Sequence, residues 1–196
     1  MIRLNTPLTE EKIAGLKVGD QVLISGTLYS ARDAAHKRMV EGLDGEKPLP
    51  FDVQGQIVFY MGPCPAAPGE IIGPAGPTTS HRMDAYTPAL LHRGLKGMIG
   101  KGNRTAPVVD AIVENQAVYF VCAGGTGMLS ASCITDAQVI AYDDLGAEAI
   151  RRLIVKDFPV IVAIDAKGNN IYENEIKKYR NYLKDKQEEV YESNGN

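Results

Sequence analysis

The chain has 196 residues, 44% of them hydrophobic, and a formal net charge of −3. This length can bury a sizeable core, and we expect a single domain over residues 1–196. The acidic balance argues against nucleic-acid or anionic-membrane binding, so any anion site has to be local. No apolar run approaches the roughly 18 residues of a membrane span. The N-terminus has no secretory pattern, so we expect a cytoplasmic protein.

The three cysteines, Cys64, Cys122 and Cys133, are widely spaced, with no C-x-x-C pair and no histidine at metal-ligand spacing. Three thiols can in principle hold a cluster with an open position. However, Cys122 and Cys133 lie in apolar context and Cys64 lies between two prolines. We interpret all three as small buried or incidental thiols and expect this chain to bind no metal or cofactor itself.

In chain order, apolar and β-branched runs predict strands, and the segments between them predict helices. The expected strands cover residues 21–28, 56–60, 96–99, 117–121, 139–142, 150–155 and 159–164. The expected helices cover residues 9–16, 30–42, 89–93, 104–114, 127–133 and 173–186. Ser30 is the expected N-cap of the second helix, and Thr87 that of the third. The alternation implies an α/β or layered β/β/α domain whose functional loops gather at strand ends.

A stretch from residue 73 to residue 103 carries the main candidate site. Glycines and prolines force an irregular backbone just before the hydroxyls of residues 78–80. Arg82 and Asp84 follow, and a short apolar strand then delivers Lys101 between two glycines. A loop that gathers hydroxyls, a guanidinium and an ammonium suits a carboxylate or a phosphate.

A second candidate region follows the strand at residues 21–28. Arg32 lies in the first turn of the next helix, where unpaired backbone N–H groups can meet an anion, and His36 shares its face one turn later. Each candidate has an ordinary alternative. Arg32 can be solvated, His36 can be a packed structural histidine, and the hydroxyls of residues 78–80 can cap turns or helices. Composition does not choose between them.

The turn at residues 124–127, Gly-Gly-Thr-Gly, could cradle a phosphate, but it lacks both glycine-rich nucleotide-binding patterns. Close packing of a helix on a strand is the better interpretation of these glycines. Nucleotide binding is therefore a minor alternative.

Several motifs occur in a consistent order along nearly the whole chain. They are Arg-Asp-Ala-Ala-His at 32–36, Gly-Pro-Thr-Thr-Ser at 76–80, Arg-Met-Asp at 82–84 and Gly-Lys-Gly at 100–102, with Gly-Pro at 62–63, Phe-Pro at 158–159, Asp165 and Gly-Asn-Asn at 168–170. Together they resemble the β subunit of the iron–sulfur class I fumarate hydratases and tartrate dehydratases.

The resemblance implies a swivelling β/β/α domain that forms half of an active site. The other half, with the cysteine ligands of a [4Fe-4S] cluster, belongs in this family to an α subunit or to a fused N-terminal region. We therefore expect a subunit of a hetero-oligomer that is catalytically incomplete alone. The implied reaction is the reversible hydration of fumarate, a C4 dicarboxylate, to (S)-malate.

Two alternatives stay open: an L(+)-tartrate dehydratase β subunit and a non-catalytic dicarboxylate-binding module. The motifs at 32–36 and 82–84 look more like the fumarate branch. His81 stands where fumarate hydratases often have a small residue, which can shift selectivity.

The resemblance also assigns roles to individual residues. Arg32, Arg82 and Lys101 match the family's cations around the substrate carboxylates, and Thr78 matches a threonine proposed to act in proton transfer. A threonine hydroxyl is a poor base alone, so Thr78 needs a neighbouring base. The expected catalytic residues are Thr78, Arg82 and Lys101. The expected substrate-binding residues are Arg32, His36, Thr79 and Asp84. These roles require Arg32, Arg82 and Lys101 to converge on one small pocket from three separate strand ends.

Overall fold

The structure is a computed structural model that describes residues 1–45, 47–122, 127–173 and 179–180. The charged helix expected at residues 173–186 and the turn at 124–127 therefore lie largely outside the described residues. Within the described part, no helix is both long enough and apolar enough to cross a membrane.

The described strands form one mixed sheet in the order β1-β2-β3-β4-β5-β7-β6. Strand β2 pairs with β7 as well as with β1 and β3, so β2, β3, β4, β5 and β7 close into a five-strand barrel. The strands are β1 (Ile2–Asn5), β2 (Gln21–Ser30), β3 (Ile57–Phe59), β4 (Gly97–Gly100), β5 (Val118–Val121), β6 (Ile134–Ala141) and β7 (Ile150–Ile164). The mixed α/β class is confirmed. The barrel closure was not predicted, because it depends on a pairing between the two ends of the chain.

The last strand corrects one sequence-based prediction. Two strands were expected at residues 150–155 and 159–164, but β7 runs continuously through both. Asp157 adopts a φ of 51°, and its amide donates a 3.0 Å hydrogen bond to Ser25 Oγ at a register shift against β2. Pro159, which has no amide hydrogen to donate, lies two residues after Asp157, opposite Leu23 of β2, and does not end the strand.

The helices follow the predicted order. They are α1 (Glu10–Ala14), α2 (Asp33–Asp44), α3 (Thr87–Leu91), α4 (Ala106–Glu114) and α5 (Gly127–Ser132), with short 3₁₀ helices η1 (Ser80–Met83) and η2 (Asp143–Glu148). Both predicted caps were wrong. Ser30 is the buried last residue of β2, and Arg32 precedes α2. Tyr86 precedes α3, while the Thr87 hydroxyl donates to the Met83 carbonyl oxygen at 2.9 Å.

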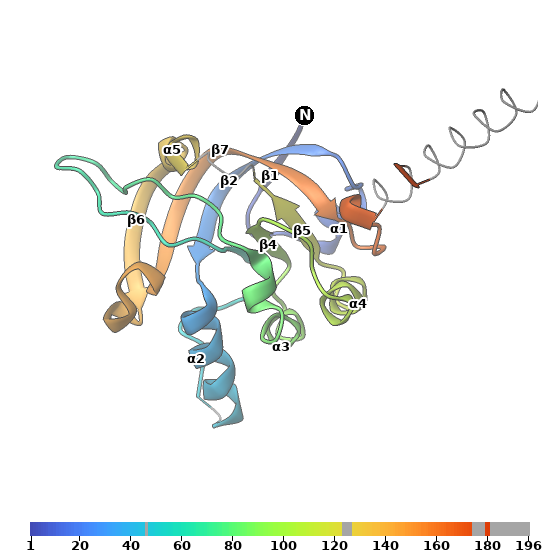
Figure 1. The fold of residues 1–196 in the computed structure, drawn as a ribbon, viewed down its shortest axis with the longest axis horizontal. Helices are drawn as coiled ribbons and strands as arrows, with labels where there is room; N and C mark the ends of the chain where they lie inside the picture. The colour runs from blue at the N-terminus through green and yellow to red at the C-terminus, as the bar shows by residue number, and fades with distance from the viewer. Residues whose placement is uncertain (46, 123–126, 174–178, 181–196) are drawn as a thin grey trace, which may run out of the picture.

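Alternating side chains of the barrel strands build two apolar layers. One layer fills the barrel and includes Phe59 and Phe158, whose rings meet edge to face with centroids 5.3 Å apart. The other layer lies outside the barrel and includes Tyr60, Met98 and Tyr119. Helices α2, α3 and α4 cover this outer layer together on one side (Figure 1). The two layers follow from the period of two along a strand.

Strands β2, β3, β4 and β5 run parallel to one another, so their carboxyl ends share one edge of the barrel. A long proline-rich loop at residues 62–77 leaves β3 at this edge and extends away from the barrel beyond β6 (Figure 1). Its base is closed by a bridge between Met61 and Pro77 and by a 3.0 Å hydrogen bond from the Cys64 amide to the Pro74 carbonyl oxygen. The segment with the predicted hydroxyls therefore starts beside the end of β3.

Candidate functional site

Two of the predicted cations meet at one carboxylate. Arg32 Nη2 lies 3.6 Å from Asp33 Oδ1, and Arg82 Nη1 lies 3.8 Å from the same oxygen. Arg32 also forms a 3.1 Å ion pair with Glu148 Oε1. The Arg32 side chain is 23% exposed and that of Arg82 is 55% exposed. Asp33 therefore links the guanidinium of Arg32, just after β2, to that of Arg82 in η1.

Polar groups in this cluster remain unpaired. The buried Arg32 Nε and Asp33 Oδ1 have no hydrogen-bond partner among the residues described. Both Asp33 contacts are longer than a hydrogen bond, so they hold the arginines only loosely. Gly62 allows the close packing here, because a Cβ atom at this position would lie 3.2 Å from Arg32 Cδ and 3.0 Å from the Ala147 carbonyl oxygen.

The third predicted cation is connected through the backbone. Lys101 forms an isolated parallel bridge with Thr79, and its carbonyl oxygen accepts a 3.0 Å hydrogen bond from the Ser80 amide. The Thr78 amide donates a 2.7 Å hydrogen bond to the Tyr60 carbonyl oxygen. Residues 78–80 therefore run between the ends of β3 and β4. The Thr79 and Lys101 residues are exposed, and Thr78 is partly buried.

Gly100 is needed where the segment of residues 78–80 packs against the end of β4. A Cβ atom there would collide with Ser80 Oγ and lie 2.9 Å from Tyr60 Cδ2. The Tyr119 hydroxyl donates to the Gly102 carbonyl oxygen at 2.8 Å, and Ser80 Oγ lies 2.8 Å from the same hydroxyl. Because the phenol has one proton and a carbonyl can only accept, Ser80 is the donor to Tyr119. Burial raises the pKa of Tyr119, which keeps this phenol neutral.

Asp84, predicted to bind substrate, is buried in an ion pair. Its Oδ1 accepts a 2.7 Å hydrogen bond from Arg104 Nε, and its Oδ2 accepts one of 2.8 Å from the Thr105 amide. Arg104 Nη2 also donates to Thr87 Oγ1 at 2.8 Å. The Arg104 side chain is fully buried. Sequence reasoning missed Arg104, which it counted only as the start of a helix. Its place three residues after Lys101 was the available signal.

His36, also predicted to bind substrate, is completely buried on the inner face of α2. Its Nδ1 lies 2.8 Å from the Arg32 carbonyl oxygen, so Nδ1 carries the proton. The ring meets Tyr60 edge to face with centroids 5.2 Å apart. Burial lowers the pKa of His36 to about 4, against the opposing effect of the Arg32 hydrogen bond. A neutral His36 therefore braces the backbone of Arg32.

The seven predicted site residues thus fall into two groups. Five of them lie at the carboxyl edge of the parallel strands, in two sets of contacts. Asp33 links Arg32 to Arg82, and a separate backbone bridge links Thr79, next to Thr78, to Lys101. Beneath them, His36 and Asp84 are buried and contact other protein groups. The exposed group offers fixed positive charge and hydroxyls, an arrangement suited to an anionic ligand.

The described residues do not fit a cluster or metal site. Among them, no three His, Cys, Asp or Glu side chains gather closely enough to hold an ion. Cys64 is exposed in the long loop, Cys133 is partly buried and Cys122 is buried. Burial raises the pKa of the Cys122 thiol to about 12, so this group is not a ready thiolate ligand.

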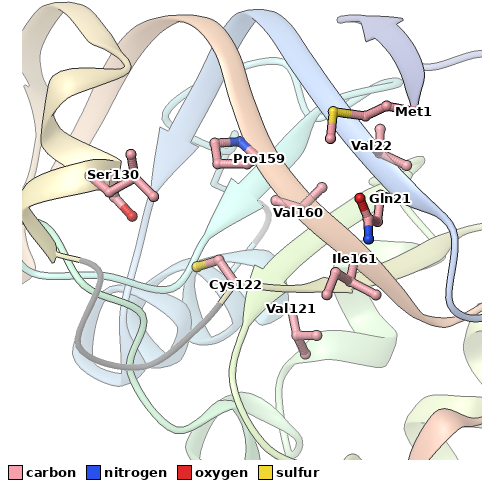
Figure 2. A pocket seen from close by; sticks show the side chains of 10 residues that line it. Met1, Gln21, Val22, Val121, Cys122, Ser130, Pro159, Val160 and Ile161 are labelled. Atoms are coloured by element: carbon pink, nitrogen blue, oxygen red, sulfur yellow. The ribbon is translucent and has the colours of Figure 1, made fainter.

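An apolar pocket of about 240 Å³ lies elsewhere, between β2, β5, β7 and α5. Figure 2 shows Cys122 among its lining side chains, together with Val22 and Ile161. None of its lining side chains is charged. A doubly charged acid would lose hydration there without gaining a partner, so the pocket is not a candidate for that ligand.

The profile of the family described as "Fumarase C-terminus" matches residues 1–175. The chain belongs to this family. It is 34% identical over 181 residues to the anaerobic class I fumarate hydratase of Escherichia coli, covering 90% of this chain and 33% of the relative. It is 35% identical over 177 residues to the mitochondrial fumarate hydratase 1 of Leishmania major, covering 88% of this chain and 32% of the relative.

A third relative has nearly the length of this chain. It is a Methanocaldococcus jannaschii protein whose name assigns it provisionally as the β subunit of an L(+)-tartrate dehydratase. The two proteins are 34% identical over 177 residues, which cover 87% of this chain and 91% of the relative. The chain thus spans about a third of the fumarate hydratases it matches and most of this subunit. The resemblance inferred from the motifs is confirmed.

Proposed function

We propose that this chain is the β subunit of a hydro-lyase that interconverts fumarate and (S)-malate. In this proposal an α subunit holds a [4Fe-4S] cluster, and the chain described above supplies cations for the dicarboxylate. The names of the fumarate hydratase relatives support the reaction, and the short Methanocaldococcus relative supports the separate subunit. Because this chain's described residues gather no cluster ligands, we assign no step to a cluster on it.

The convergence of Arg32 and Arg82 on Asp33 is the observation that carries the proposal. Both guanidinium groups lie within about 4 Å of one Asp33 oxygen, so a substrate carboxylate that enters here can replace Asp33 as their shared partner. The two Asp33 contacts are long, although Arg32 also has a 3.1 Å ion pair with Glu148. A substrate carboxylate can accept shorter, two-pronged hydrogen bonds from arginine. We therefore assign one carboxylate of the substrate to these arginines.

Lys101 and Thr78 complete the assigned roles. When water adds to one alkene carbon of fumarate, negative charge develops on the other alkene carbon and spreads into the carboxylate attached to it. Fixed cations beside that carboxylate lower the barrier. We assign this stabilisation to Arg82 and Lys101. Thr78 is assigned to proton transfer, with a base from the α subunit, because a threonine hydroxyl needs such a base to act. His36 and Asp84 are assigned to hold the cationic residues from below, which revises their predicted contact with substrate.

The remaining predictions belong to the same proposal. The chain is proposed to act as a single swivelling β/β/α domain over residues 1–196, in a cytoplasmic hetero-oligomer. The cationic edge supports this arrangement, because the Arg82 side chain is 55% exposed and Lys101 is also exposed. An active site that excludes water from such groups requires a cover from another surface.

The test combines the purified chain with a separately purified, anaerobically prepared α subunit. We expect conversion of fumarate to malate by the mixture and none by either component alone. Arg82→Ala in the mixture should abolish most of the turnover. A mixture with an intact cluster and no activity on any C4 dicarboxylate would refute the proposal.

A second candidate reaction is the dehydration of L(+)-tartrate, favoured by the relative that matches this chain over 91% of its own length. A substrate panel on the same mixture decides between the two, since the preferred substrate has the higher kcat/KM. The stand-alone binding module makes a different prediction. Millimolar malate would raise the melting temperature of the chain, and no combination with an α subunit would yield turnover.

A further inference from the structure

A buried ion pair between Asp84 and Arg104, the clasp, joins the two loops that carry Arg82 and Lys101. Asp84 lies two residues after Arg82, and Arg104 lies three residues after Lys101. Their side chains form a 2.7 Å ion pair in which both groups are almost entirely buried. The clasp therefore connects segments that leave different strands at the same edge of the barrel.

We infer that Arg104 is a positioning residue that, through Asp84, fixes Arg82 and Lys101 relative to one another. The inference rests on the proposed function for the reaction that it serves. Arg104 does not act on substrate directly, because its side chain has no exposed surface. Its influence has to pass through the backbone on either side of the clasp.

The contacts of Arg104 explain why an arginine is needed. Its Nε donates to Asp84 at 2.7 Å, its Nη2 donates to Thr87 at 2.8 Å, and its Nη1 lies 3.4 Å from the Tyr60 hydroxyl. The guanidinium carbon also lies 5.4 Å from the Tyr60 ring centroid and 5.0 Å from that of Tyr119. The planar guanidinium group, with several N–H donors, contacts all of these partners at the same time, whereas a lysine ammonium is a single point charge.

The clasp is tied to the main chain on both sides. The second oxygen of Asp84 accepts from the Thr105 amide at 2.8 Å, just before α4 begins at Ala106. On the other side, the Asp84 amide donates to the His81 carbonyl oxygen at 3.2 Å, at the end of η1. A displaced Arg104 would therefore shift the start of α4 against η1. That shift would change the separation of the two exposed cations.

The test is the Arg104→Lys variant in the assembled enzyme with its α subunit. This variant keeps the buried charge and removes the planar guanidinium group. We expect kcat/KM for fumarate hydration to fall by about a hundredfold, mainly in kcat, because small misplacements of stabilising groups have effects of this order. The matched control is Lys96→Met, which removes a cation of 12% exposure at the opposite end of β4 and should leave kcat and KM unchanged.

A double-mutant cycle separates positioning from general destabilisation. In a Lys101→Ala background the cation to be positioned is gone. Arg104→Lys should therefore lower kcat/KM by a clearly smaller factor there than it does in the wild type. If Arg104→Lys does not yield folded protein, Asp84→Asn is used in the same cycle, since it weakens the clasp from the other side. Full additivity, or a kcat/KM within twofold of wild type, would overturn the inference.

The activity of the wild-type complex is measured first. This distinguishes a failure of the proposed hydro-lyase function from a failure of the positioning role of Arg104. A wild-type complex without turnover refutes the proposed function alone. The positioning role is then measured by malate binding to the isolated chain. Arg104→Lys should weaken that binding at least tenfold while Lys96→Met leaves it unchanged, and equal affinities in the two variants would refute the role.

Discussion

The Ser80 amide donates a 3.0 Å hydrogen bond to the carbonyl oxygen of Lys101. This contact joins the segment after the long loop to the end of β4, although neither belongs to a regular strand at that point. It brings the hydroxyl segment and the lysine to one edge of the barrel. Because backbone hydrogen bonds hold this arrangement, the exposed side chains can be changed with little effect on the fold.

Arg82→Ala should separate activity from stability. The Arg82 side chain is 55% exposed and its contact with Asp33 is 3.8 Å long, so the free energy of unfolding should change by less than about 1 kcal/mol. In the complex with the α subunit, kcat/KM should fall by about 10²- to 10³-fold, as expected for a lost charge-stabilising donor. Arg93→Ala, an exposed arginine just after α3, is the control and should change neither quantity. Equal activity in the two variants would remove Arg82 from the site.

The glycines on either side of Lys101 should respond differently to alanine. At Gly100 a Cβ atom collides with Ser80 Oγ, so Gly100→Ala should lower the free energy of unfolding by about 1 to 3 kcal/mol or more. Gly102 has a φ of +85° and open space around it, so Gly102→Ala should cost only about 1 kcal/mol of backbone strain. Urea denaturation measures both. A larger loss for Gly102→Ala would contradict the packing described for Ser80.

The positions of Arg32 and Lys101 just after β2 and β4 could be predicted from the sequence, because apolar strand patterns end shortly before both residues. In a sheet with parallel strands these ends share an edge, so Arg32 and Lys101 were expected near each other. The resemblance supplied the roles, and the contacts of Asp33 link Arg32 to Arg82. The sequence pattern does not indicate how deeply a side chain is buried. For this reason His36 and Asp84 were expected at the surface, whereas the structure buries both.

Other features depend on contacts between distant segments. The barrel closes through pairing of β2 with β7, and a local pattern does not indicate which strands become neighbours. The Arg104 clasp likewise needs Asp84 and Thr87 to fold beside the start of α4. A buried arginine looks the same in sequence as a solvated one, since only its partners make burial tolerable.

The cysteines should differ widely in reactivity. Cys64 is exposed, whereas Cys122 is buried with its thiol pKa raised to about 12 by desolvation. At pH 8 only about one Cys122 thiol in ten thousand is ionised, so iodoacetamide should modify Cys64 first and Cys122 very slowly. Mass spectrometry of the labelled chain measures both rates, with urea-unfolded protein as the control in which all thiols react. Rapid labelling of native Cys122 would contradict its burial.

Stability should depend on pH through His36. Its pKa is about 4 in the folded chain, against about 6.5 in an unfolded one, so the unfolded state binds the proton more tightly. The contribution of neutral His36 is complete above about pH 6.5 and is lost as the pH falls from there towards 4. The difference of about 2.5 pKa values corresponds to a loss of about 3 kcal/mol.

The His36→Gln variant isolates this effect from the titration of carboxylates. Gln cannot protonate, so the variant should be less stable than wild type at pH 7, and the gap should narrow by about 3 kcal/mol by pH 4. Urea denaturation at a series of pH values measures both curves. His92→Gln is the control, because His92 is 52% exposed in a pair with Glu114 that contributes little. If the His36→Gln curve instead ran parallel to wild type, His36 would not be held neutral by burial, and its role as a neutral brace beneath Arg32 would be wrong.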